Sequence, residues 1–170
     1  LTTTYGSTTT LAAALVTAHI QNLAGLATGT TYHYRVRSTN GVGLLATSAD
    51  ATFTTVAVPV ISGMGASAIT GTAATIGWTT DQTTDSQVEY GPTTAYGSTA
   101  LDATLVSAHS LTLAGFTPGT FYHYRVTSAN SAGQTTSSGD FTFTTASAPV
   151  ISAVGVAAVS GSSATIVWTT

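Results

Sequence analysis

Short alternations of apolar and polar residues, separated by corners that contain glycine or proline, run along most of the chain. The alternation places Ala74, Ile76 and Trp78 on one face of a strand, and it places Val88 and Tyr90 on one face of the next. Further strands are expected near residues 60–61, 96–99, 111–113, 122–126 and 141–143. About seven short strands with frequent turn signals predict an all-β protein with an immunoglobulin-like two-sheet sandwich.

One phrase of the sequence occurs twice. Residues 113–126 read LAGFTPGTFYHYRV, and residues 23–36 read LAGLATGTTYHYRV, 90 positions earlier. The same offset superimposes Trp78 on Trp168, and it becomes 91 positions upstream of Leu15. A repeat of this length indicates tandem domains of about 90 residues, because solenoid units span only about 20 to 50 residues.

The repeat divides the chain into three parts. Residues 56–145 are expected to form a complete domain, residues 1–55 to hold the last four strands of one domain, and residues 146–170 to hold the first two strands of another. The counterpart of residues 81–91, the third strand, falls in neither terminal part. A sheet of few strands with an uncovered apolar face is marginal in water. Two explanations stay open: the natural chain continues at both ends, or the terminal strands of one chain complete the partial domain of the next by donor-strand complementation.

The complete repeat resembles a fibronectin type III domain. The residues that carry the resemblance are the inward-facing Trp78, residues 88–91 (VEYG) on the third strand and residues 113–126. The resemblance implies that Tyr122 is a tyrosine corner, whose hydroxyl bonds to backbone a few residues upstream. It implies little about activity, because this fold carries many unrelated functions. In the first copy Gln21 interrupts the expected alternation, which leaves the strand there less well defined.

Composition excludes several classes of function. Charged residues make up 5% of the chain, against about a quarter in an ordinary soluble domain. Lysine is absent and the formal net charge is −3, so the basic surface that a phosphate backbone requires is missing and no nucleic-acid partner is expected. No apolar run approaches the roughly 18 to 20 residues of a membrane helix, and without cysteine there is no disulfide or thiolate chemistry.

The four histidines are the strongest candidate metal ligands. His33 and His123 are expected to point outward on corresponding strands of the two copies, whereas His19 and His109 are expected to begin a strand of the opposite sheet. The two histidines of one copy should therefore not converge on a metal ion. We interpret all four as surface or turn histidines.

The carboxylates suggest no reaction centre. Asp81 and Asp85 share one predicted loop, but two carboxylates fall short of the six to eight oxygens around calcium, and nothing places them across a cleft. We interpret them as solvated loop residues. Glu89 is expected to face outward, and the strand order that the resemblance implies would place it beside Arg125, in an exposed pair that contributes about 0–1 kcal/mol. With no nucleophile elbow and no phosphate-binding glycine loop, no catalytic residue, cofactor or metal is expected.

These observations and the resemblance favour a non-enzymatic structural segment. We expect tandem fibronectin type III-like domains of a secreted or surface repeat protein of bacterial type, forming an extracellular stalk, spacer or filament whose partners are neighbouring copies. One alternative is an accessory spacer or binding module of a secreted carbohydrate-active enzyme. Another is an adhesin segment that binds glycans or a cell-surface protein, for which Phe121 and Tyr96 would be the exposed aromatic contacts.

Overall fold

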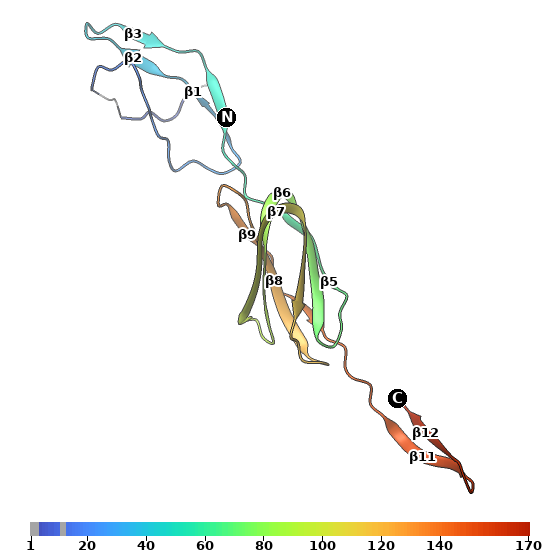
Figure 1. The fold of residues 1–170 in the computed structure, drawn as a ribbon. Helices are drawn as coiled ribbons and strands as arrows, with labels where there is room; N and C mark the ends of the chain where they lie inside the picture. Colours follow the sequence, from blue (N-terminus) through green and yellow to red (C-terminus); the bar gives the residue numbers. More distant parts are fainter. Residues whose placement is uncertain (1–3, 11–12) are drawn as a thin grey trace. The chain divides into compact units, whose positions relative to one another are not determined.

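The computed structural model describes residues 4–10 and 13–170, which are organised as strands and connecting segments (Figure 1). No helix occurs among these residues, and so none that is long and apolar enough to cross a membrane. The chain divides into two compact units, the first formed mainly by residues up to Val58 and the second mainly by residues from Pro59 onward.

The second unit contains a sandwich of antiparallel strands. Its strands are β5 (Ile61–Ser67), β6 (Ala73–Gly91), β7 (Ser98–Ala114), β8 (Phe121–Ala129), β9 (Thr135–Ser137) and β10 (Phe141–Thr144). The first half of β6 pairs with β5 and with the end of β7. The second half of β6 pairs with the start of β7 and with β8, which in turn pairs with β9 and β10.

Two strands pass from one layer of the sandwich to the other. The register between β6 and β7 shifts between Thr79 and Ser86, and in Figure 1 both strands arch over one end of the domain. The prediction of separate short strands with a loop at residues 81–85 is therefore wrong at this point. The ladder continues through the bend because Thr84 of β6 pairs with Val106 of β7.

The core lies between the two layers. It consists of Ala74, Ile76, Trp78, Val88, Leu113, Phe116, Tyr124, Val126 and Phe143, all buried. The indole N–H of Trp78 donates to the hydroxyl of Ser128 on β8 at 3.0 Å, which joins the two layers inside the core. The inward position predicted for Trp78 is confirmed.

The tyrosine corner implied by the resemblance is present. The hydroxyl of Tyr122 accepts a hydrogen bond from the N–H of Thr117 at 3.1 Å. In the first copy, the hydroxyl of Tyr32 accepts the equivalent bond from the N–H of Ala27 at 2.9 Å. The corner therefore forms with or without the proline at position 118.

The first unit contains two strand pairs. β1 (Thr31–Tyr34) pairs with β4 (Ala51–Thr54), and β2 (Arg37–Thr39) pairs with β3 (Leu45–Thr47). Residues 13–24, which correspond to β7, form no strand. In the sandwich β7 pairs with β6, and the described residues of the first unit include no counterpart of β6 for residues 13–24 to pair with. Part of the strand expected upstream falls on residues 11–12, outside the described residues.

The chain ends in a hairpin of β11 (Ser152–Val159) and β12 (Ala164–Thr169). These strands correspond to β5 and the first half of β6. Their pairing of Val156 with Ile166 repeats the pairing of Ala66 with Ile76 in the sandwich. The hairpin therefore keeps the register of the complete domain from Ser152 to Val156, and beyond Val156 its register shifts, so that Ala158 pairs with Thr165.

Candidate functional site

A polar cluster joins three elements on the face of β8 that points away from the core. Nδ1 of His123 lies 2.8 Å from Oδ2 of Asp140, and the hydroxyl of Tyr96 donates to Oδ1 of the same carboxylate at 3.2 Å. The guanidinium of Arg125 lies over the ring of Tyr96, 5.0 Å from its centroid. Partial burial, and then the bond to Asp140, raise the pKa of Tyr96. The cluster fastens the turn before β7 to β8 and β10.

The same cluster recurs in the first unit. Nδ1 of His33 lies 2.7 Å from Oδ2 of Asp50, the hydroxyl of Tyr5 donates to Oδ1 at 2.7 Å, and Arg35 lies 4.3 Å from the centroid of the Tyr5 ring. The hydrogen bonds from Tyr5 and His33 hold the pKa of Asp50 below its usual value. Because both copies build the same contacts, we interpret the cluster as a fastening of the fold.

The aspartates of these clusters were not expected from the sequence. Asp50 and Asp140 are 90 residues apart, the same separation as His33 and His123. That shared separation was the signal that could have paired each aspartate with its histidine.

The expected cross-strand ion pair is confirmed. Glu89 of β6 lies directly opposite Arg125 of β8, and Nε of Arg125 donates to Oε2 of Glu89. This hydrogen bond holds the pKa of Glu89 below its usual value. Both side chains remain partly exposed, so solvent screens the pair and its effect on stability is small.

The interpretation of His109 as a surface or turn histidine is wrong. Its side chain is buried, and its ring stacks on Trp78 with the centroids 4.7 Å apart. Nε2 lies 2.9 Å from the hydroxyl oxygen of Thr80, and Nδ1 lies 2.7 Å from that of Ser86. His109 takes this position because it lies inside β7, at the bend between the two layers, on the face that points into the sandwich.

The burial of His109 has an electrostatic consequence. Desolvation lowers the pKa of its imidazole, and the negative charge of Asp85 opposes that shift. The alternation of His109 with Leu111 and Leu113 along β7 was the signal that could have placed the ring inside, since Leu113 is buried and Leu111 packs against the core.

Asp81 and Asp85 are not loop residues, because both lie within β6. Oδ1 of Asp81 accepts a hydrogen bond from the N–H of Val60 at 2.8 Å, and Oδ1 of Asp85 accepts one from the N–H of Ala129 at 2.7 Å. Each carboxylate therefore ties a different segment of backbone to β6. Among residues 4–10 and 13–170, no three His, Cys, Asp or Glu side chains gather into a group that could hold a metal ion.

Three candidates from the sequence remain: the aromatic residues Phe121 and Tyr96, and His19. Phe121 is half exposed, and its ring meets that of His123 edge-on at 5.1 Å. Tyr96 is partly covered through its contacts with Arg125 and Asp140. His19, the first-copy counterpart of the buried His109, is exposed.

The first unit presents an aromatic face without a second layer. Tyr32 stacks on Phe53 with the centroids 5.7 Å apart and the planes 20° apart. In the complete sandwich Tyr122 and Phe143 have the same arrangement, at 5.7 Å and 19°. The first unit therefore builds the packing geometry of a sandwich core on one side only, and an open hollow of about 2470 Å³ lies against it.

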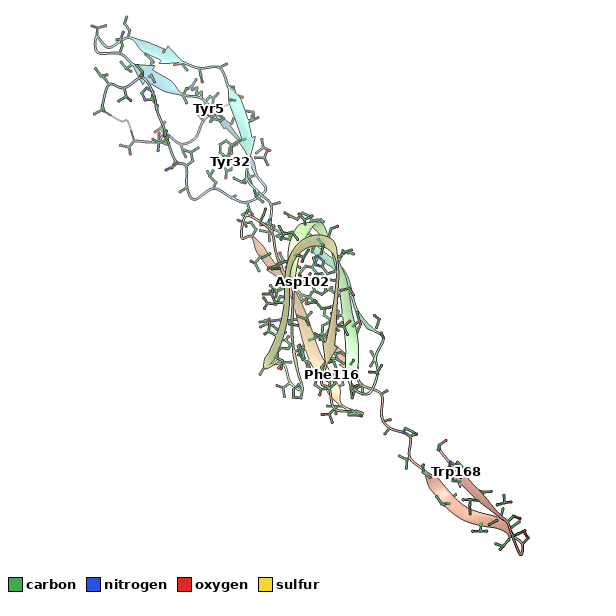
Figure 2. The ribbon with its side chains drawn as sticks, in the orientation of Figure 1. Tyr5, Tyr32, Asp102, Phe116 and Trp168 are labelled. Atoms are coloured by element: carbon green, nitrogen blue, oxygen red, sulfur yellow. The ribbon has the colours of Figure 1, made fainter. Side chains whose placement is uncertain are left out.

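Residues at equivalent positions of the repeat differ in exposure. Tyr34 is 41% exposed whereas its counterpart Tyr124 is 2% exposed, and Trp168 is 58% exposed whereas Trp78 is 2% exposed. Figure 2 labels Trp168 on the terminal hairpin. Both ends of the chain thus carry aromatic side chains that are core residues in the complete domain.

Comparison with known proteins agrees with this architecture. The family model of the fibronectin type III domain matches residues 59–144, about half of the chain. The chain is 36% identical over 149 residues to Endoglucanase B of Cellulomonas fimi, and this alignment covers 81% of the chain and 14% of that protein. The chain thus spans a small fraction of that relative's length.

Solved structures give lower similarity. The sensor domain of the anti-sigma factor RsgI4 of Pseudobacteroides cellulosolvens is 22% identical, with 55% of this chain and 100% of that chain covered and a TM-score of 0.41. The FN1–FN3 domains of chicken CNTN1 are 20% identical, with 71% and 44% covered and a TM-score of 0.42. The match of the family model to residues 59–144, together with the sandwich and its tyrosine corner, shows that the chain belongs to the fibronectin type III family.

Proposed function

We propose that this chain is a non-enzymatic structural segment of an extracellular or cell-surface protein, in which fibronectin type III domains follow one another head to tail as a stalk, spacer or filament. Domains of this family are typically non-catalytic. One observation carries the proposal. The connector that follows each copy of the repeat begins at residues 55–56 and 145–146, and in both places it makes the same hydrogen bonds to its own copy.

In the second copy the fastening begins at Thr145. Its hydroxyl donates a hydrogen bond to the carbonyl of Thr117 at 2.7 Å and accepts one from the N–H of Thr120 at 2.9 Å. The N–H of Gly119 then donates to the carbonyl of Ala146 at 3.2 Å. These bonds hold the first residues of the connector against the corner that precedes β8.

In the first copy the equivalent residues make the equivalent bonds. The hydroxyl of Thr55 donates a hydrogen bond to the carbonyl of Ala27 at 2.6 Å and accepts one from the N–H of Thr30 at 2.9 Å. The N–H of Gly29 donates to the carbonyl of Val56 at 3.1 Å. A connector that is held in the same way after each copy suits a repeated spacer.

The start of the complete domain is held as well. The N–H of Val60 donates to Asp81 at 2.8 Å, and the hydroxyl of Thr136 donates to the carbonyl of Pro59 at 2.6 Å. Residues 57–58 alone separate this anchor from the fastening of the first copy. Such a short, anchored connector differs from the flexible Gly/Ser-rich linkers that give domains independent reach.

Single-molecule stretching of the natural full-length gene product tests the proposal. An array predicts repeated unfolding events that each release about 90 residues, which is roughly 300 Å of extended chain. A gene product that shows a single event of this size, next to the unfolding of an unrelated catalytic domain, would contradict the array.

A second candidate function is an accessory module of a secreted carbohydrate-active enzyme, and the similarity to Endoglucanase B favours it. Under this proposal, removal of residues 56–145 would leave turnover of a soluble oligosaccharide unchanged and lower turnover of an insoluble polysaccharide. An adhesin segment would instead show glycan or protein binding that Phe121→Ala abolishes, since Phe121 is the half-exposed ring on β8.

A further inference from the structure

We propose that Asp81 and Thr145 are two mechanical latches, which fasten the incoming and the outgoing connector at opposite ends of one strand, so that the sandwich carries tension lengthwise. The incoming connector leads into β5, and the outgoing connector follows β10. The proposal rests on the proposed head-to-tail array, because a stalk or filament is pulled through its connectors. It deepens that function by naming the residues that bear the load.

The incoming connector is fastened just before β5 begins. Oδ1 of Asp81 accepts a hydrogen bond from the N–H of Val60 at 2.8 Å, and the N–H of Asp81 donates to the carbonyl of Val60 at 3.3 Å. The preceding residue, Pro59, is buried, and its carbonyl accepts a hydrogen bond from the hydroxyl of Thr136 at 2.6 Å. Asp81 therefore binds the connector through both its side chain and its backbone.

The outgoing connector is fastened just after β10 ends. Thr145 is buried, and its hydroxyl is bonded to the backbone of the corner before β8. The next residue, Ala146, donates its N–H to the carbonyl of Thr70 at 3.1 Å, in the turn between β5 and β6. A β-carbon at Gly71 of this turn would lie 3.2 Å from the carbonyl oxygen of Ala146, so the connector lies directly against the turn.

The two fastenings lie at opposite ends of the first half of β6. Thr70 is bonded to Ala73, the first residue of β6, through both its hydroxyl and its backbone N–H. From Ala73 to Asp81 the strand spans roughly 27 Å, at about 3.3 Å per residue. Figure 1 accordingly shows the chain entering the sandwich at one end and leaving it at the other. Tension between the two connectors is therefore directed along β6.

The first half of β6 suits this load because it has a partner strand on each side, β5 and the end of β7. Force along paired strands is shared by all the hydrogen bonds of the ladder at once. Force across the strands breaks the same bonds one after another. The latches hold the ends of β5 and β10 against the sandwich, so the load stays along the strands.

The number of hydrogen bonds in each latch sets the size of the expected effect. The side chain of Asp81 makes one bond with a charged acceptor, and the hydroxyl of Thr145 makes two neutral bonds. Either contribution to stability corresponds to a change in rate of roughly tenfold. Loss of a latch should appear as faster unfolding under force, because forced unfolding is governed by the unfolding rate.

Stretching the 170-residue chain between chosen points tests the proposal. The chain contains no cysteine, so a pair of introduced cysteines defines where the force acts. Val58→Cys with Ala148→Cys loads the sandwich through its two connectors. Thr94→Cys with Ser131→Cys loads it through two exposed turns and through neither connector. A latch should matter in the first geometry alone.

Two latch variants and a matched control complete the design. Under one constant force through the connectors, Asp81→Ala and Thr145→Val should each unfold roughly tenfold faster than the wild type, and through the turns within about twofold of it. Ser138→Ala is the control, because its hydroxyl also accepts a backbone N–H and donates to a carbonyl, at 3.0 and 2.8 Å, but on neither connector. Its effect should be the same in both geometries.

Thr145→Ser keeps the hydroxyl, so it should unfold within about twofold of the wild-type rate in both geometries. Urea unfolding without force shows that each variant is folded. Latch variants that are accelerated equally in both geometries, or that match the wild type when pulled through the connectors, would overturn the proposal. None of these outcomes depends on how many repeats the natural gene product contains, which its own stretching measures separately.

Discussion

The imidazole of His109 lies flat on the indole of Trp78, with the ring planes 7° from parallel. The two residues face each other on β7 and β6, at the bend where both strands pass between the layers. Hydroxyl groups of Thr80 and Ser86 meet the two ring nitrogens. His109 therefore stabilises the bend through hydrogen bonds, at the edge of an otherwise apolar core.

Replacement of His109 by alanine should destabilise the sandwich. The substitution removes the stacked ring together with the hydrogen bonds it makes to the buried hydroxyls of Thr80, Thr84 and Ser86. We expect the free energy of unfolding to fall by about 2–4 kcal/mol, measured by urea denaturation followed by circular dichroism. His123→Ala is the control, because its partly exposed pair with Asp140 should contribute at most about 1 kcal/mol. Equal losses in the two variants would contradict this account of His109.

The stability of the sandwich should decrease in mild acid because of His109. Burial lowers the pKa of its imidazole in the folded state, whereas in the unfolded chain a histidine titrates near pH 6.5. Below about pH 6.5 the unfolded chain binds a proton that the folded chain does not, so the contribution of His109 is complete above this pH and is lost as the pH falls toward the folded pKa.

The measurement compares wild type with His109→Gln at about pH 7.5 and about pH 5.5. The wild type should lose stability relative to the variant, with a slope of at most about 1.4 kcal/mol per pH unit. Parallel changes in the two proteins would show that His109 does not titrate as its burial requires.

Much of the fold follows from the sequence because it depends on local patterns. Alternation places Trp78 in the core, and the strand order implied by the family resemblance sets Glu89 opposite Arg125. The resemblance carried by the LAG…YHYRV phrase implies the corner at Tyr122. Strand periodicity can be recognised from neighbouring residues, whereas the strand order and the corner were expected only from the resemblance.

The features that the sequence did not reveal depend on distant partners. Asp81 and Asp85 look like loop residues until the backbone groups they bind, at Val60 and Ala129, are known. His109 likewise looks like a surface residue until its hydroxyl partners are counted. Alternation shows which way a polar side chain points, but only the folded chain shows whether its hydrogen bonds are satisfied inside.

The tyrosine corner can be tested by removing a single oxygen atom. Tyr122→Phe keeps the ring in the core but removes the acceptor for the N–H of Thr117. We expect a loss of about 1–2 kcal/mol in the free energy of unfolding. Tyr32→Phe removes the equivalent bond in the first unit, and it should leave the main transition, that of the complete sandwich, unchanged. A main transition that responds equally to both variants would show that the corner does not act within its own copy.

Gly91 is required by a close approach of the backbone. A β-carbon at this position would lie 1.5 Å from the carbonyl oxygen of Tyr96. Gly91→Ala should therefore push the turn before β7 away from β6 and destabilise the sandwich by at least about 2–4 kcal/mol. Gly139→Ala is the matched control, since a β-carbon there meets nothing within 4 Å, and it should change stability by no more than about 0.5 kcal/mol. Thermal unfolding distinguishes the two, and an undisturbed Gly91→Ala protein would refute the close approach.

The central claim is that residues 59–144 form a complete sandwich with its own buried core, which the described residues of the β11–β12 hairpin do not share. Hydrogen exchange of the backbone amides of Val88 and Ile166 tests it most directly. We predict that the amide of Val88 exchanges only through global unfolding at every protein concentration. In the 170-residue chain the amide of Ile166, which lies on the exposed hairpin, should exchange far faster. Equal protection of the two amides would contradict the account.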